Sequence, residues 1–96
     1  MANARKNEFS PNVVFPPGDT LRETITSMSM SQADLALRMG VTEKHINEVI
    51  KGRATITEGT ALKLEKVLGV DASFWRNLES QYRRHLAEKE TISNKI

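Results

Sequence analysis

Apolar residues recur every three or four positions in five successive segments, and short polar or glycine-containing breaks separate these segments. That spacing places the apolar side chains on one face of an amphipathic helix. In chain order, the apolar sets are Leu21, Ile25 and Met28; Leu35, Ala36 and Met39; Ile46, Val49 and Ile50; Leu64, Val67 and Leu68; and Phe74, Trp75, Leu78, Tyr82 and Leu86. The pattern predicts an all-α fold of five helices that share one core.

Polar caps and glycines indicate where these helices begin and end. The expected N-caps are Ser31, paired with Asp34 as in a capping box, Thr42 and Thr57, and the expected left-handed stops are Gly40, Gly52 and Gly69. The first helix should begin near Asp19, whose charge suits the positive end of the helix dipole. The last helix should run from about Asp71 to about Glu90.

The length of the chain sets the scale of the fold. Ninety-six residues fit one small domain, which we expect over residues 18–90, between an extended N-terminal arm (1–17) and a frayed tail (91–96). Cysteine is absent, so apolar packing and not disulfides should stabilise the fold. No signal-peptide core and no bilayer-length apolar run are visible. We therefore expect a cytoplasmic protein without a membrane partner.

Residues 31–51 have the layout of two short helices joined by the tight turn "MGVT". In such a helix-turn-helix, the second helix lies in the major groove of DNA. If its aliphatic residues face inward, its outer face carries Glu43, Lys44, Asn47, Glu48 and Lys51, with His45 near the flank. The net charge of +2 permits a nucleic-acid partner without requiring one. The spacing alone equally fits a helix whose polar face is only solvated.

The residue types on this outer face can form hydrogen bonds with base edges. Lys44 can donate to guanine, Asn47 can pair with adenine, and the glutamates can accept from cytosine. Because glutamate repels phosphate, contacts to the DNA backbone should come from the surroundings: Ser31, Gln32, Thr42, Lys51, Arg53 and Thr55. No metal or other cofactor is expected, since His85 is the only possible histidine partner of His45. The sequence also lacks a cysteine nucleophile, a phosphate-binding glycine loop and a zinc motif, so we do not expect an enzyme.

The stretch from "SQADLALRMGVTEKHINEVIKG" to "ASFWRNLESQYR", preceded by "PPGDTLRE", resembles the HigA/VapI-type branch of the Xre (lambda-repressor-like, Cro/C1) helix-turn-helix family. The resemblance covers about residues 16–86 and implies a five-helix, lambda-repressor-like DNA-binding domain. It also implies an antitoxin that dimerises, represses its own operon and neutralises a HigB-like RNA-cleaving toxin. In that family pattern, Gln32 matches a phosphate-contacting glutamine, and the base-reading positions match Glu43, Lys44, His45 and Glu48. Lys51 and Arg53 flank the end of the recognition helix, and Asn47 belongs partly to the family framework.

Two departures from the family pattern and two alternative functions remain open. Gly59 stands in the first turn of the fourth helix, where it should cost up to ~1 kcal/mol relative to alanine, and Ala72 stands where the family often has proline. The same motifs resemble the N-terminal domain of longer proteins that continue into an ImmA/IrrE-type zinc peptidase. The other alternative is a protein-interaction module that does not bind an operator.

A dimer is expected because one helix-turn-helix module buries only about 600–1,000 Å² on DNA. Useful specificity therefore normally needs two modules on adjacent half-sites. The last helix carries more large apolar residues than so small a core needs, which makes Phe74, Trp75, Leu78 and Tyr82 the first candidate interface. The second candidate is the N-terminal set Phe9, Val13, Val14 and Phe15.

Overall fold

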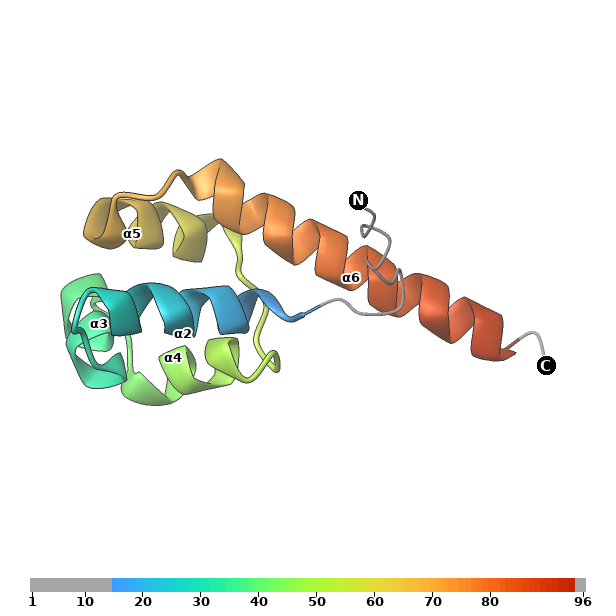
Figure 1. Cartoon of the computed structure of the whole chain (residues 1–96), viewed down its shortest axis with the longest axis horizontal. Helices are drawn as coiled ribbons and strands as arrows, with labels where there is room; N and C mark the ends of the chain where they lie inside the picture. The colour runs from blue at the N-terminus through green and yellow to red at the C-terminus, as the bar shows by residue number, and fades with distance from the viewer. Residues whose placement is uncertain (1–14, 95–96) are drawn as a thin grey trace, which may run out of the picture.

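The computed structural model describes residues 15–94, with side chains as far as residue 90, and this part of the chain is helical without strands. Its helices are α2 (Pro17–Ser27), α3 (Gln32–Met39), α4 (Glu43–Ile50), α5 (Glu58–Leu68) and α6 (Ala72–Asn94). Figure 1 shows α2 through the middle of the molecule, with α4 along one side, α5 along the other and α3 across one end. The predicted all-α, five-helix fold is confirmed.

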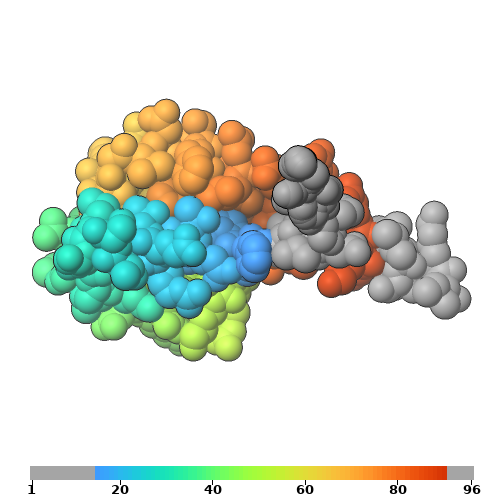
Figure 2. All heavy atoms as spheres, in the orientation of Figure 1, coloured from blue at the N-terminus to red at the C-terminus, as the bar shows by residue number. Residues whose placement is uncertain are grey.

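Helix α6 packs against α5 and α2 with its N-terminal part, and its later turns extend beyond the body formed by α2–α5 (Figure 2). It continues to Asn94, so residues 91–94, which we expected to fray, belong to the helix. Helix α2 begins at Pro17, one residue inside the expected arm, because proline suits the first position of a helix. The rest of that arm, including Phe9, Val13 and Val14, lies outside the described residues, as do residues 95–96. No helix in the described part of the chain is long and apolar enough to span a membrane.

The predicted apolar faces meet in one core, whose largest member is the fully buried Trp75. Two residues depart from the prediction. Met28 is 45% exposed, because α2 ends at Ser27 and Met28 therefore does not continue the apolar face of the helix. Val67 is only half-buried. The core also includes Ile56, which lies between helices in a segment that has no helical periodicity.

The predicted caps are present at the helix ends. Ser31 Oγ accepts the Asp34 N–H at 3.0 Å, and the Asp34 carboxylate accepts the Ser31 N–H at 3.4 Å. Thr42 and Thr57 each accept an amide N–H of their own first turn, from His45 and Thr60. The three predicted stops, Gly40, Gly52 and Gly69, all have positive φ angles. These local interactions fix the lengths of α3, α4 and α5.

Candidate nucleic-acid interface

Helix α4 is held against the body by its aliphatic face. Ile46, Val49 and Ile50 are 1%, 2% and 5% exposed. The turn before α4 is closed by a hydrogen bond from the Val41 N–H to the Ala36 oxygen at 3.0 Å. The opposite face of α4 is therefore fixed in orientation by packing. On it Glu43 and Lys44 are exposed, and His45, Asn47 and Glu48 are half-buried. Lys51, the C-cap residue that follows the helix, is also exposed.

A hydrogen bond ties α4 to the start of α3. The Asn47 amide nitrogen donates to Gln32 Oε1 at 3.3 Å, across fifteen positions of the chain. Because this bond uses the oxygen of Gln32, the NH₂ group of that side chain is the part suited to donate to a phosphate oxygen. Asn47 thus supports Gln32, a role that fits a framework residue better than base readout.

Glu48 and Arg53 form an ion pair at the end of α4. The Arg53 Nη1 atom lies 3.4 Å from Glu48 Oε2, and the two side chains are 65% and 30% exposed. The backbone N–H groups of Arg53 and Ala54 also donate to the Glu48 carbonyl oxygen, at 2.9 and 3.1 Å. Pairing with Arg53 offsets the negative charge of Glu48 that would otherwise repel phosphate. An exposed pair contributes only about 0–1 kcal/mol, so a phosphate can compete for the guanidinium.

Residues 51–57, which we call the contact loop, follow α4 and carry the remaining backbone-contact candidates Lys51, Arg53 and Thr55, all exposed. Side chains of α6 hold this loop from the other side. Glu79 accepts the Ile56 N–H at 3.2 Å, Arg76 donates to the Ile56 oxygen at 2.6 Å, and Arg83 donates to the Gly52 oxygen at 3.4 Å. Sequence reasoning missed these contacts. Their one trace in the sequence is that Glu79 falls on the apolar face of α6, four residues after Trp75.

The residues expected to form a dimer interface separate into two groups. Trp75 is fully buried in the core. The prediction that it forms part of a dimer interface is therefore wrong, because a side chain without exposed surface cannot contact a partner directly. Phe74 is 41% exposed and packs edge-on against Trp75, with ring centroids 5.1 Å apart. Leu78 and Tyr82 are half-buried. Of the four predicted interface residues, Phe74 is therefore the most exposed to solvent.

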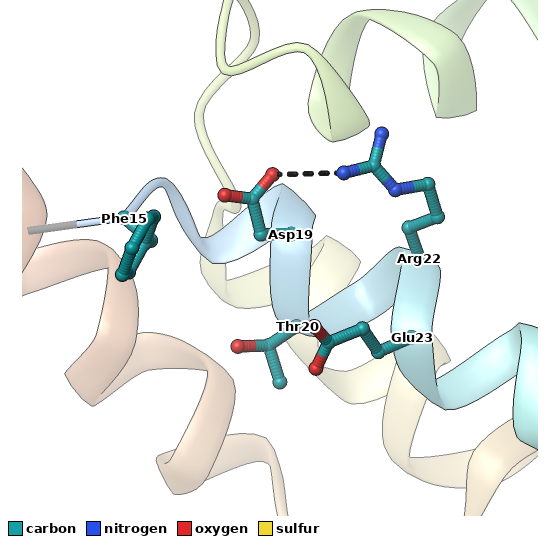
Figure 3. A pocket seen from close by; sticks show the side chains of 5 residues that line it. All are labelled: Phe15, Asp19, Thr20, Arg22 and Glu23. Carbon is teal, nitrogen blue, oxygen red and sulfur yellow. Dashed lines mark hydrogen bonds and ion pairs between the residues drawn. The ribbon is translucent and has the colours of Figure 1, made fainter.

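Phe15, the described member of the second candidate interface, is 69% exposed. It lines an open depression of about 240 Å³ together with Asp19, Thr20, Arg22 and Glu23 at the start of α2, with α6 nearby (Figure 3). Asp19 and Arg22 pair with each other at 3.3 Å. Among the side chains described, no three histidine, aspartate or glutamate residues lie close enough together to hold a metal ion.

Comparisons with known proteins agree with this arrangement. The Helix-turn-helix family model matches residues 21–75. The chain is 35% identical to Virulence-associated protein I of Dichelobacter nodosus over 94 residues, which is 97% of this chain and 84% of that protein.

Among the solved structures that share the fold are two antitoxins. An addiction module antidote protein of the HigA family from Coxiella burnetii is 30% identical, with a TM-score of 0.75 over 83% of this chain and 88% of that one. The Pseudomonas aeruginosa antitoxin HigA, solved with the higBA promoter, is 27% identical, with a TM-score of 0.73 over 88% of this chain and 96% of that one. The family comprises transcription regulators and antitoxins and not enzymes. The chain belongs to the Xre-type helix-turn-helix family and has the fold of HigA-like antitoxins.

Proposed function

We propose that the protein is a sequence-specific transcriptional repressor and the antitoxin of a HigBA-like toxin-antitoxin system. It binds a double-stranded operator through α4 and autoregulates its operon in the cytoplasm. The observation that carries this proposal is the orientation of α4: its three aliphatic residues are buried, which leaves Glu43 and Lys44 exposed on the opposite face. The similar antitoxin solved with its promoter supports DNA as the ligand of this face.

In this proposal the DNA-contacting residues divide into two sets. Base edges are read by Glu43, Lys44, His45 and Glu48, and the phosphate backbone is contacted by Ser31, Gln32, Thr42, Lys51, Arg53 and Thr55. Asn47 acts mainly by holding Gln32, through the 3.3 Å hydrogen bond between them. The base-reading set determines which operator is chosen, and the backbone set supplies affinity that is independent of sequence.

The repressor acts as a homodimer, because two modules are needed to read two half-sites. Phe74 on α6, with Leu78 and Tyr82 on the same helix, is the proposed centre of the interface. The second protein partner is a HigB-like toxin. Similarity to HigA-type antitoxins supports the toxin as a partner, and the need for two DNA-reading modules supports the dimer.

The test compares Lys44→Ala with Arg53→Ala on a duplex recovered by selection from a random-sequence pool and on an unselected duplex of equal length. Lys44→Ala should reduce the preference for the selected duplex, and Arg53→Ala should weaken binding to both duplexes about equally. The wild-type affinity should fall steeply as salt rises, since phosphate contacts release counterions. Binding that salt does not weaken, or no binding to any duplex, would favour a protein-interaction module instead. Equal behaviour of the two variants would contradict the division of roles.

A further inference from the structure

Among the side chains described up to residue 90, Glu79 is the one charged group that is buried, with 3% of its surface exposed. It lies in α6, outside the segments that carry the proposed DNA contacts. Burying an ionised carboxylate is costly unless hydrogen bonds and an opposite charge satisfy it, and an apolar residue of similar volume would fill such a position at lower cost. The core alone therefore does not account for a carboxylate here.

Both oxygens of the Glu79 carboxylate are engaged, and both interactions lead to the contact loop. Oε1 accepts the Ile56 N–H, and Oε2 accepts from Nε of Arg83. The same guanidinium donates through Nη2 to the Gly52 carbonyl oxygen at 3.4 Å. Glu79 thus holds one end of the stretch 52–56 directly and the other end through Arg83.

The stretch between these two anchors is itself neither helix nor strand, and its backbone is held at both ends. Its start is fixed to α4, because the N–H groups of Arg53 and Ala54 donate to the Glu48 oxygen. Its end is fixed to α6, because both backbone polar groups of Ile56 bind α6 side chains. Buried backbone groups need such partners. Between the anchors lie Arg53 and Thr55, two of the proposed phosphate contacts.

We infer that Glu79 is a positioning residue for DNA binding: from α6, its carboxylate fixes the conformation of the contact loop, directly at Ile56 and through Arg83 at Gly52. The inference rests on the proposed function, because it concerns residues assigned to phosphate contact. It extends the set of residues that determine affinity to a helix that does not lie in the groove. An apolar residue could stabilise the core at this position, but it could not bind the backbone of the contact loop. Positioning of the loop therefore accounts for a carboxylate here.

Two variants test the carboxylate, and one control matches their charge change. Glu79→Leu removes both interactions, Glu79→Gln keeps an oxygen for the Ile56 N–H, and Glu58→Gln makes the same change of charge at an exposed residue that pairs with Arg76 of α6 at 3.5 Å. The probe is a labelled random-sequence duplex at low salt, and amide hydrogen exchange of Arg53 and Ala54 is measured without DNA. Neither amide binds Glu79, so neither changes merely because its acceptor is lost.

We expect Glu79→Leu to weaken duplex binding by roughly tenfold and to speed amide exchange at Arg53 and Ala54. Glu79→Gln should have a smaller effect on both the affinity and the exchange rates. Each variant makes the protein more positive by one charge, which by itself favours DNA binding. Glu58→Gln should therefore bind as tightly as wild type or more tightly. The sign of the change separates loop positioning from a general charge effect.

A second pair of variants keeps the inference testable should Glu79→Leu fail to fold. Arg83→Gln removes the link to Gly52 from a half-buried position, and Arg84→Gln makes the same change at its exposed neighbour. Only Arg83→Gln should speed exchange at Arg53 and Ala54. Wild-type exchange and affinity in folded Glu79 and Arg83 variants would overturn the inference. A wild-type protein that binds no duplex would instead refute the proposed function, and the exchange rates would still decide whether Glu79 fixes the loop.

Discussion

Gly18 and Gly59 occupy the same position, the second residue of α2 and of α5, but their surroundings differ. A Cβ atom on Gly18 would lie 2.1 Å from the carbonyl oxygen of Ile50, whereas the nearest atom to a Cβ on Gly59 would be Thr57 Oγ1 at 4.0 Å. The close approach of α2 to α4 therefore requires glycine at position 18. We predict that Gly18→Ala lowers the free energy of unfolding by about 1–3 kcal/mol. Gly59→Ala should raise it by up to ~1 kcal/mol, because alanine is the better helix former.

Chemical denaturation of the two alanine variants checks this pair. The single tryptophan, Trp75, is fully buried, so its fluorescence reports loss of the core. Both substitutions add the same methyl group, and only the surroundings of that group differ. A stabilising effect of Gly18→Ala, or changes of the same sign in both variants, would contradict the close packing of α2 on α4.

At the residue scale, the sequence predicts what depends on near neighbours. The cap at Ser31 and the stop at Gly40 involve residues within a few positions of each other, so their pattern is visible in the chain. The roles of Ile56 and Glu79 depend on contacts 23 residues apart, and no local pattern reports them. Asn47 is an intermediate case: its place on α4 was predicted, but its bond to Gln32 requires the packing of α3 on α4.

At the scale of the helix, Thr42 and Thr57 perform the same local task on different elements. Thr42 Oγ1 accepts the His45 N–H at 3.0 Å at the start of α4, and Thr57 Oγ1 accepts the Thr60 N–H at 3.2 Å at the start of α5. We predict that Thr42→Ala and Thr57→Ala each lower the free energy of unfolding by about 1 kcal/mol. Only Thr42→Ala should also weaken DNA binding, because Thr42 caps the proposed recognition helix and is itself a proposed phosphate contact.

Thermal unfolding and duplex titration, performed on both variants and on Thr42→Ser, separate the two effects. Serine keeps the hydroxyl that caps α4, so Thr42→Ser should retain both stability and affinity. If Thr57→Ala lost as much affinity as Thr42→Ala, general destabilisation would explain the loss, and α4 would have no special part in it.

Helix boundaries followed from the sequence where a cap or a glycine marks them. Helices α3 and α5 begin immediately after the predicted caps and end immediately before the predicted glycines. The C-terminal end of α6 has no such marker, and the helix continues to Asn94 instead of ending near Glu90. The apolar stripe of α6 was identified, but its division between core and surface was not. That division depends on how α5 and α2 cover the helix, which periodicity alone does not specify.

At the scale of the whole molecule, exposed apolar side chains are spread over several segments of the chain, and a dimer need not cover all of them. Phe74 on α6 is 41% exposed, Phe15 before α2 is 69% exposed, and Leu37 on α3 is 81% exposed. Exposure alone does not choose among these faces, since single apolar residues are common on protein surfaces. We favour Phe74 because its ring packs against that of the buried Trp75. An interface at Phe74 would therefore be continuous with the core of the domain.

We predict that light scattering of the wild-type protein at high micromolar concentration gives the mass of two chains, and that Phe74→Ser shifts it to one. In a two-fold symmetric dimer each residue occurs twice in the interface, so the loss of one aromatic contact per chain should raise the dissociation constant by roughly tenfold or more. Leu37→Ser removes a more exposed side chain of similar character and should leave the mass unchanged.

A shift with Phe15→Ser alone would move the interface to the start of α2, and a monomeric wild type would reject the homodimer. Phe74 also contacts Trp75, so thermal unfolding of Phe74→Ser must accompany the measurement: a folded monomer identifies an interface residue, and an unfolded chain identifies a core residue.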